Sequence, residues 1–455
     1  MRSSNRTLDQ EAKGVGNVYS FAAVNTLSFQ MVIGSPMILY AKSLNASATV
    51  LGVIAGMLPL MVILQIPAAR FVDEVGYKKF VLSGWSIRTV FVGLMVIVPF
   101  TAGFLPEESR LVLILVLLFL FNVSRGISSC GWLPWIASLF PAKMRGKFLT
   151  REATMVNLAS FFAFWLAAFV LGAEPAPWQF ASLFFFSTVC AIISLAFLRR
   201  IPEEEKVEAD TRPPRPSLSE MLSARPFRKL LVMNVVWALA NGGVLTFLVA
   251  WLKSEGSWTE RSILMLTSVT FIGALTNQII FSRYLDRFGS RPLLLSGMVI
   301  WTILLGSWTI IAGGMISSEP LFIISLMFVL GLGGSMVNLS NVRLAMLAVP
   351  DVGRSHYFAI FSVVSSVSLG LAPVLWGILI DGVSGLSVQT KFRFEWNEWT
   401  VLFSLLSLLF VVSFFLCLRL EEPRSVRWEA LTRFLLRRSR ARYWMRAWTR
   451  MTPRS

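Results

Sequence analysis

Long apolar stretches, separated by short polar ones, follow one another along almost the whole chain. Twelve of them reach the roughly 20 residues that a helix needs to cross a hydrocarbon core of about 30 Å. They run over residues 17–41, 48–71, 79–104, 110–139, 147–172, 178–199, 228–253, 259–284, 291–315, 319–347, 353–381 and 398–420. The pattern therefore predicts an all-α membrane protein with twelve transmembrane helices.

Composition supports lipid as the solvent. Of the 455 residues, 55% are hydrophobic and 15% charged, and the mean hydropathy is +0.67. A charged surface of that size is too small for a water-soluble protein. The first apolar stretch follows a charged segment and has no small-residue cleavage site behind it, so we expect a retained span. Cys130, Cys190 and Cys417 all fall inside predicted spans, without metal or disulfide spacing. We predict no metal site and no cofactor.

The basic residues predict the orientation. With both termini in the cytoplasm, 34 of the 42 Lys and Arg residues lie in inner segments, 6 in outer loops and 2 in spans. Because Lys and Arg are retained on the cytoplasmic side during insertion, this distribution favours cytoplasmic termini. A basic inner surface beside anionic lipid also accounts for the net charge of +17 without a nucleic-acid partner. The compact loops favour a plasma membrane, of the bacterial inner type.

The last segment, residues 421–455, is rich in arginine and aromatic residues. From Arg424 to Arg454 it contains ten Arg and one acid, Glu429, with Trp and Leu interspersed at roughly helical spacing. Aromatic and basic side chains together suit the headgroup region of a bilayer. We expect an amphipathic tail that lies on the anionic inner leaflet.

A polar segment divides the spans six and six. It covers residues 199–227 and contains the run Glu203-Glu204-Glu205 and several prolines, a composition typical of a solvated linker. The expected units are an N-terminal bundle (1–198), the cytoplasmic linker (199–227), a C-terminal bundle (228–420) and the tail. We expect a monomer.

The two halves share an internal repeat. The segment ARFVDEVGYKK (69–79) follows the second span, and SRYLDRFGSRP (282–292) follows the eighth, at an offset of 213 residues. At an offset of 209 residues, Pro141 and Arg145 correspond to Pro350 and Arg354. The pairs in the first repeat are Arg70 and Arg283, Asp73 and Asp286, Gly76 and Gly289, and Lys78 and Arg291.

At these loops the chain resembles the major facilitator superfamily, whose signature is G-x-x-x-D-R-x-G-R-K. Ala69 and Ser282 stand in place of the first Gly, and Glu74 where a basic residue is usual. The resemblance covers nearly the whole chain. It implies two pseudo-symmetric six-helix bundles and a secondary active transporter that moves a small solute by alternating access.

The resemblance also implies an inner gate. Asp73 and Asp286 would act as latches that hold the gate closed, with Arg145 and Arg354 as partners. Gly76 and Gly289 would permit the tight turn. Lys78 and Arg291 complete this set of expected gating residues. The alternative is that all of these are solvated turn residues.

Charges inside the spans are few. Only Arg88 and Arg125 lie well inside, and none of the 25 acidic residues does. The superfamily places spans one, four, seven and ten around a central cavity, so Arg125 in span four is the leading substrate contact. Its guanidinium would suit a carboxylate, a phosphate or another anion. The alternative is an arginine neutralised by helix carbonyls or a neighbouring polar side chain. For Arg88 we expect snorkelling or a structural pair.

Four polar residues on the same spans are further substrate-contact candidates. Asn25 and Gln30 lie in span one, and Asn338 lies in span ten after a Gly-rich segment that favours close helix packing. Asn241 precedes Gly242 and Gly243 in span seven, where the helix is expected to bend.

Other classes of function are less well supported. The chain has no Walker-type phosphate loop, which argues against ATP-driven transport. It also has no metal-ligand cluster, paired acids or nucleophile motif at membrane depth, which argues against an enzyme. A transporter-like protein without transport activity, acting as an assembly or sensing factor, stays open as the alternative. We expect a secondary transporter of a small solute, with an organic anion favoured by Arg125.

Overall fold

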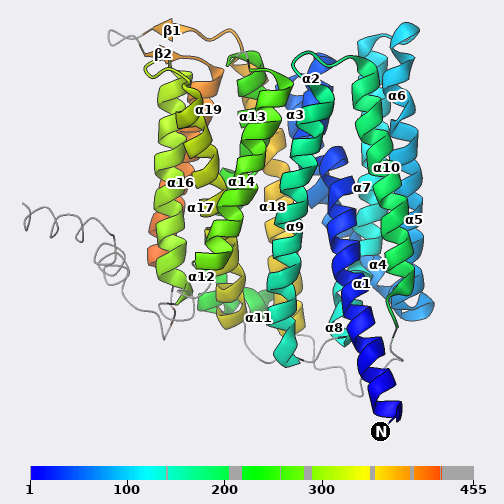
Figure 1. Ribbon diagram of the computed structural model, residues 1–455. Helices are drawn as coiled ribbons and strands as arrows, with labels where there is room; N and C mark the ends of the chain where they lie inside the picture. The colour runs from blue at the N-terminus through cyan, green and yellow to red at the C-terminus, as the bar shows by residue number, and fades with distance from the viewer. Residues whose placement is uncertain are drawn as a thin grey trace, which may run out of the picture.

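The computed structural model consists of long helices that run roughly side by side (Figure 1). It describes residues 2–139, 142–203, 218–256, 258–280, 289–348, 354–389, 394–420 and 422. Twelve helical segments in this part of the chain are long and apolar enough to cross a membrane. The prediction of twelve spans in an all-α protein is therefore confirmed. The segments of the linker and tail at 204–217 and 423–455 lie outside the described residues.

The helices fall into two sets of six spans. The first set comprises α1 (Arg2–Ile33), α2 (Ser35–Ser43), α3 (Ala48–Leu60), η1 (Met61–Leu64), α4 (Gln65–Val75), α5 (Tyr77–Met95), α6 (Ile97–Phe100), η2 (Thr101–Gly103), α7 (Glu107–Ser128), η3 (Ser129–Gly131), α8 (Trp132–Leu139), α9 (Ala142–Leu171) and α10 (Pro177–Arg200). The second set comprises α11 (Leu218–Ser223), α12 (Arg225–Asn241), α13 (Val244–Ser254), α14 (Glu260–Ile280), α16 (Ser290–Ala312), α17 (Pro320–Ala348), α18 (Arg354–Gly382), β1 (Val388–Gln389), β2 (Glu395–Trp396) and α19 (Glu398–Leu418).

Several spans are interrupted where the sequence contains Gly or Pro. Span one breaks at Gly34, ahead of Pro36 in the first turn of α2. Span seven breaks between α12 and α13, where Gly243 has a φ of +82°. A β-carbon is strained at that φ, so glycine is required there. The bend expected in span seven is present.

The outside of the bundle is apolar. Phe100, Phe104 and Leu321 are 61%, 76% and 76% exposed, respectively. In water such a surface would drive aggregation, whereas lipid chains cover it without cost. Aromatic and aliphatic side chains also fill the interior, and the largest buried cluster contains residues from both halves, such as Tyr40, Phe164 and Trp251.

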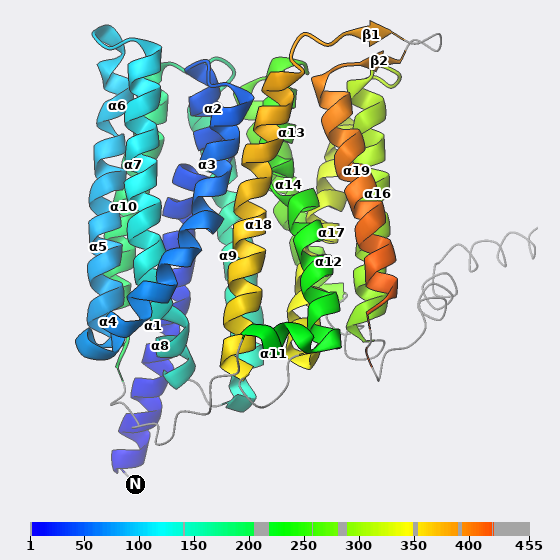
Figure 2. The ribbon, with the colours of Figure 1, turned by 180° about the vertical axis from the view of Figure 1, so that it is seen from behind.

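The halves contact each other mainly along two helix pairs, α3 with α18 and α9 with α14, and α13 also packs on α2 and α3. We call the end with the β1–β2 hairpin the outer face, and the end with Gly76 and Gly289 the inner face. The hairpin covers the outer ends of α16 and α19, and α11 crosses the inner end (Figure 2). The continuation of α3 toward the inner face, α4, packs on α5 and α7 of its own half.

Candidate functional site

Arg88 bridges two helices of the N-terminal half. It lies on α5, is only 5% exposed, and donates a hydrogen bond from Nη2 to Oδ1 of Asn25 on α1. Its guanidinium carbon lies 4.4 Å from the ring centre of Trp85 and 5.7 Å from that of Phe121. The side chain is therefore paired inside the bundle and does not snorkel to the headgroups.

Arg125 approaches the same face of α1. Its guanidinium carbon lies 5.3 Å from the ring centre of Phe29, one helical turn after Asn25. The residue is half-buried, and its guanidinium makes no ion pair or hydrogen bond with any residue that the structure describes. It is thus a cation at membrane depth that aromatic contact stabilises only in part.

The two arginines lie at neighbouring depths near the middle of the membrane. Arg88 is two residues from the midpoint of its span Tyr77–Gly103, and Arg125 is six residues from the midpoint of Glu107–Gly131, both toward the inner face. At 1.5 Å per residue these positions are about 3 Å and about 9 Å from the centre. The positive charge of Arg125 acts on Arg88 and repels it.

No carboxylate in the described spans neutralises this pair. Glu152 lies farthest from a helix end, as the eleventh residue of α9 (Ala142–Leu171), and among the described residues it makes no ion pair or hydrogen bond with either arginine. Every other Asp and Glu in those spans lies within the first or last three residues of its span. Two repelling cations without a counter-ion are costly in a low-dielectric interior. Their arrangement fits a site whose counter-ion arrives as a ligand.

The other sequence-predicted contacts lie on separate helices. Gln30 donates a 2.8 Å hydrogen bond to Oγ of Ser160 on α9. Asn241 ends α12 and is half-buried, whereas Asn338 is exposed on α17. Of these four candidates, Asn25 is the one that forms a hydrogen bond with an arginine, Arg88, among the described residues.

A neutral polar chain occupies the C-terminal half. Asn341 on α17 donates a 2.6 Å bond to Oδ1 of Asn234 on α12, and Asn234 donates from Nδ2 to Oγ of Ser365 on α18. The sequence prediction missed Asn234 and Ser365. The signal was present, because Asn234 follows Asn25 by 209 residues, the offset of one of the two matched loops.

The outer end of the boundary between the halves is sealed by small residues. A β-carbon on Gly52 or Gly56 of α3 would collide with the backbone of α18 at Pro373 or Gly370, respectively. One on Gly377 of α18 would collide with the backbone at Ala48. The two backbones therefore touch, as small-residue helix pairs do in membranes.

Asp381 completes this outer seal. Its Oδ1 accepts a 3.0 Å bond from the Ala48 backbone N–H, and its Oδ2 a 2.8 Å bond from that of Thr49. These are the first free N–H groups of α3, and Oγ of Ser47 accepts from the next, that of Val50. A carboxylate of one half thus caps a helix of the other, at the positive end of its dipole.

The repeated loops at the inner face share one construction. Gly76 and Gly289 have φ angles of +90° and +89°, directly before α5 and α16. Lys78 N–H donates 3.0 Å to Oε1 of Glu203, just after α10. In the same way, Arg291 N–H donates 2.8 Å to Oε2 of Glu422, just after α19.

The sequence prediction missed both caps, although Glu203 and Glu422 each stand beside a proline after the last span of a half. At the start of the third span, Glu203 accepts from one backbone N–H, that of Lys78, and Glu422 accepts from two, those of Ser290 and Arg291. The Arg291 side chain also donates to the Leu418 carbonyl oxygen.

The expected latch residues are placed only in part. Asp73, Arg145 and Arg354 lie in helical backbone of α4, α9 and α18, and their side chains are outside the described part of the structure. Asp286 lies in residues 281–288, also outside it. The inner latch therefore stays a prediction.

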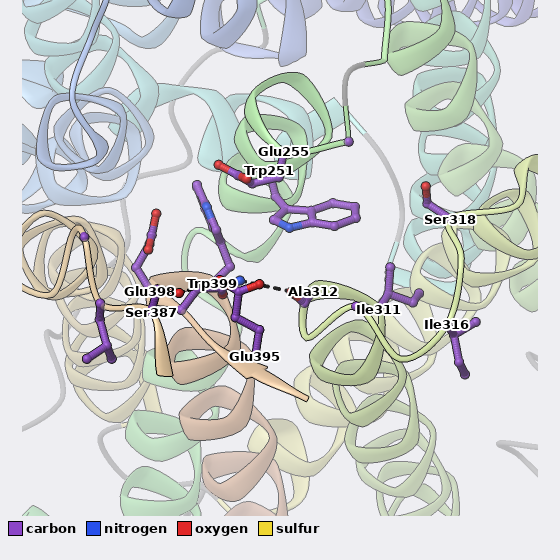
Figure 3. Close-up of a pocket in the computed structure, with 15 residues that line it drawn as sticks. Trp251, Glu255, Ile311, Ala312, Ile316, Ser318, Ser387, Glu395, Glu398 and Trp399 are labelled. Atoms are coloured by element: carbon purple, nitrogen blue, oxygen red, sulfur yellow. Dashed lines mark hydrogen bonds between the residues drawn. The ribbon is translucent and has the colours of Figure 1, made fainter. Parts of the chain in front are cut away.

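A separate cavity of about 490 Å³ opens at the outer face of the C-terminal half. Figure 3 shows the indole of Trp251 on one side and Glu398 with Trp399 on another. All of its lining residues belong to α13, α16, β2, α19 and the neighbouring loops of one half. It therefore lies apart from Arg88 and Arg125.

Solved structures of similar fold include several membrane transporters. One is the D-xylose-proton symporter, with a TM-score of 0.71 and 13% identity, covering 90% of this chain and 99% of that one. Another is the inward open xylose transporter XylE from E. coli, with a TM-score of 0.67 and 12% identity, covering 92% and 98%. A bacterial homologue of the iron transporter ferroportin, in an inward-facing state, has a TM-score of 0.66 and 13% identity, covering 91% and 98%. No curated protein matches the chain.

The fold is thus that of a multi-pass integral membrane protein with two repeated helical halves. The chain matches the family model of the Major Facilitator Superfamily over residues 18–257 and again over 230–451, and it belongs to that family. The protein is a secondary transporter of small solutes and not an enzyme.

Proposed function

We propose that this transporter carries a small organic anion, bound at Arg125. The observation that supports the proposal is the half-buried guanidinium of Arg125 near mid-membrane, without an ion pair or hydrogen bond among the described residues. A guanidinium binds carboxylate or phosphate oxygens in a two-pronged geometry, and the low local dielectric strengthens the attraction. Asn25, Gln30, Asn241 and Asn338 are proposed as further substrate contacts.

Alternating access would use two different closures. At the outer face, Asp381 and the glycine contacts between α3 and α18 hold the halves together in this structure. At the inner face, Asp73 and Asp286 would hold them together in the opposite state. Substrate would then leave the Arg125 site toward the inner face while the outer seal is closed.

The surroundings of the protein are part of the proposal. The distribution of Lys and Arg supports cytoplasmic termini in a plasma membrane of the bacterial inner type. The ten arginines between Arg424 and Arg454 support attachment of the tail to anionic lipid. A single chain supplies all twelve spans, which supports a monomer.

Uptake into proteoliposomes tests the proposal. Purified protein should move members of a panel of radiolabelled organic anions, and not matched neutral or cationic solutes. Arg125→Ala should abolish uptake while leaving the melting temperature of the ligand-free protein near that of wild type. Arg110→Ala is the matched control, since Arg110 is also a buried arginine on α7 but lies at the outer end. Unaltered uptake by Arg125→Ala would remove Arg125 from the site, and a panel in which nothing moves would support the non-transporting alternative.

A further inference from the structure

The internal repeat allows the positions of Arg88 and Arg125 to be compared with the corresponding positions in the C-terminal half. Trp301 follows Arg88 by 213 residues, the offset of one matched loop, and Gly334 follows Arg125 by 209 residues, the offset of the other. Trp301 lies on α16 and Gly334 on α17, the third and fourth spans of the second half. These residues therefore occupy the corresponding places in the C-terminal half.

In the C-terminal half these places are filled by apolar packing. Trp301 is 3% exposed and stacks on Phe410, with ring centres 4.9 Å apart and nearly parallel planes. A β-carbon on Gly334 would lie 3.6 Å from the Trp301 ring, and one on Gly333 would lie 3.3 Å from its Nε1. An indole packed against glycines thus joins the third and fourth spans without any charge.

The N-terminal half has two guanidinium groups in the same places. Arg88 and Arg125 repel each other, and each has an aromatic face as neighbour in place of a carboxylate. In the C-terminal half, uncharged residues are sufficient to pack the third span against the fourth. Helix packing therefore does not explain why the N-terminal half has arginines at these positions. Charged side chains inside a membrane span are costly, and where they occur they usually have a functional role.

We propose that Arg88 and Arg125 together form a site for a doubly charged anion, either a phosphate monoester or a dicarboxylate. This inference rests on the proposed anion transport and narrows its substrate class. Arg125 contacts the anion directly, since it is the more exposed of the two residues and its guanidinium has no hydrogen-bond partner among the described residues. Arg88, which donates a hydrogen bond to Asn25, acts as a positioning residue that supplies the second charge.

The charge assignment predicts selectivity between matched probes. A monoanion neutralises the charge of one guanidinium and leaves the charge of the other without a counter-ion. A dianion neutralises both, so wild type should bind dianions more tightly than monoanions of similar size, by at least about tenfold.

The test measures binding to the purified full-length protein in lipid nanodiscs at pH 8, where a phosphate monoester is doubly charged. The probes are two pairs of a monoanion and a dianion: butyrate with succinate, and acetate with methyl phosphate. Isothermal titration gives the dianion-to-monoanion affinity ratio for wild type, Arg88→Gln, Arg88→Lys and the control Arg110→Gln.

We expect Arg88→Gln to lower this ratio to near one while monoanion binding at Arg125 persists. Arg88→Lys keeps the charge and should keep most of the preference, which separates a lost charge from a damaged fold. Arg110→Gln should leave the ratio unchanged.

Each contrary outcome has its own meaning. If wild type binds monoanions and dianions equally, or if Arg88→Gln keeps the full ratio, the two-arginine site is wrong and the anion transporter stands. If no anion binds to wild type, or if Arg125→Gln keeps full affinity for every anion, the proposed function is wrong as well.

Discussion

Replacing Asp381 by Asn should loosen the outer seal. Asp381 is the side chain through which α18 accepts hydrogen bonds from two backbone N–H groups of α3, at 3.0 and 2.8 Å. Asn retains one acceptor oxygen and lacks the negative charge. It can therefore satisfy one of the two N–H groups and no longer favours the positive end of the α3 dipole.

The size of the effect follows from these two contacts. A hydrogen bond to a charged group contributes about 1.5–3 kcal/mol net, and the lower end applies because Asp381 is half-exposed. Losing one such bond gives about 1.5–2 kcal/mol against the closed outer face. The ratio of outer-closed to outer-open protein should fall by about 10- to 30-fold.

Distances between spin labels at the outer face measure this ratio. Phe104 and Leu321 are suitable positions, because they lie at the outer ends of different halves and are each 76% exposed. Cysteines there, in a protein lacking Cys130, Cys190 and Cys417, would carry the labels for double electron–electron resonance. Asp381→Asn should increase the fraction of long distances.

A matched control separates the seal from a general effect of removing charge. Glu107 is another outer-face carboxylate, and it accepts a 2.6 Å bond from Asn45 within its own half. Glu107→Gln should leave the distance distribution unchanged. If Asp381→Asn and Asp381→Ala both give the wild-type distribution in folded protein, the carboxylate does not hold the outer face closed.

Three further sets of substitutions test the outer seal, the cap of α16 and the inner latch. Gly56→Val places side-chain atoms against the Gly370 carbonyl, so transport should be lost and the same outer distances should lengthen; normal uptake would contradict the backbone contact. Glu422→Gln weakens the cap at the start of α16 and should lower stability by about 1 kcal/mol in thermal unfolding, with no change counting against a capping role. Asp73→Asn and Asp286→Asn should each increase labelling of cavity cysteines from the inner side, and unchanged labelling in both would argue against the inner latch.

Much of the fold could be predicted because each span is specified locally. Twenty or so apolar residues can only be a helix in lipid, where every backbone group needs a partner within the chain. The breaks are harder to predict. Gly34 and Gly243 do interrupt helices, yet Gly273 and Gly331 lie within intact ones, where they let α14 and α17 approach closely.

The candidate site could be predicted less fully, because the role of each of its residues depends on contacts between spans that are distant in the sequence. A charge count finds Arg125, but it cannot show that Arg88 is directed to Asn25 and not to the headgroups. Asp381 also looks like an ordinary residue near a span end. Only the packing of α18 on α3 places its carboxylate at a helix terminus of the other half.

The asymmetry between the halves bears on how the proposed substrate would move. Both arginines belong to the N-terminal half, whereas the Asn341–Asn234–Ser365 chain in the C-terminal half is neutral. When two rigid halves rock, the contacts within one half are preserved and those across the boundary change. The anionic group would thus keep its charge contacts throughout the cycle, and the neutral half would recognise the rest of the molecule. Substitutions at Arg88 or Arg125 should therefore affect affinity in both states, whereas those at Asn341 should affect selectivity among anions of equal charge.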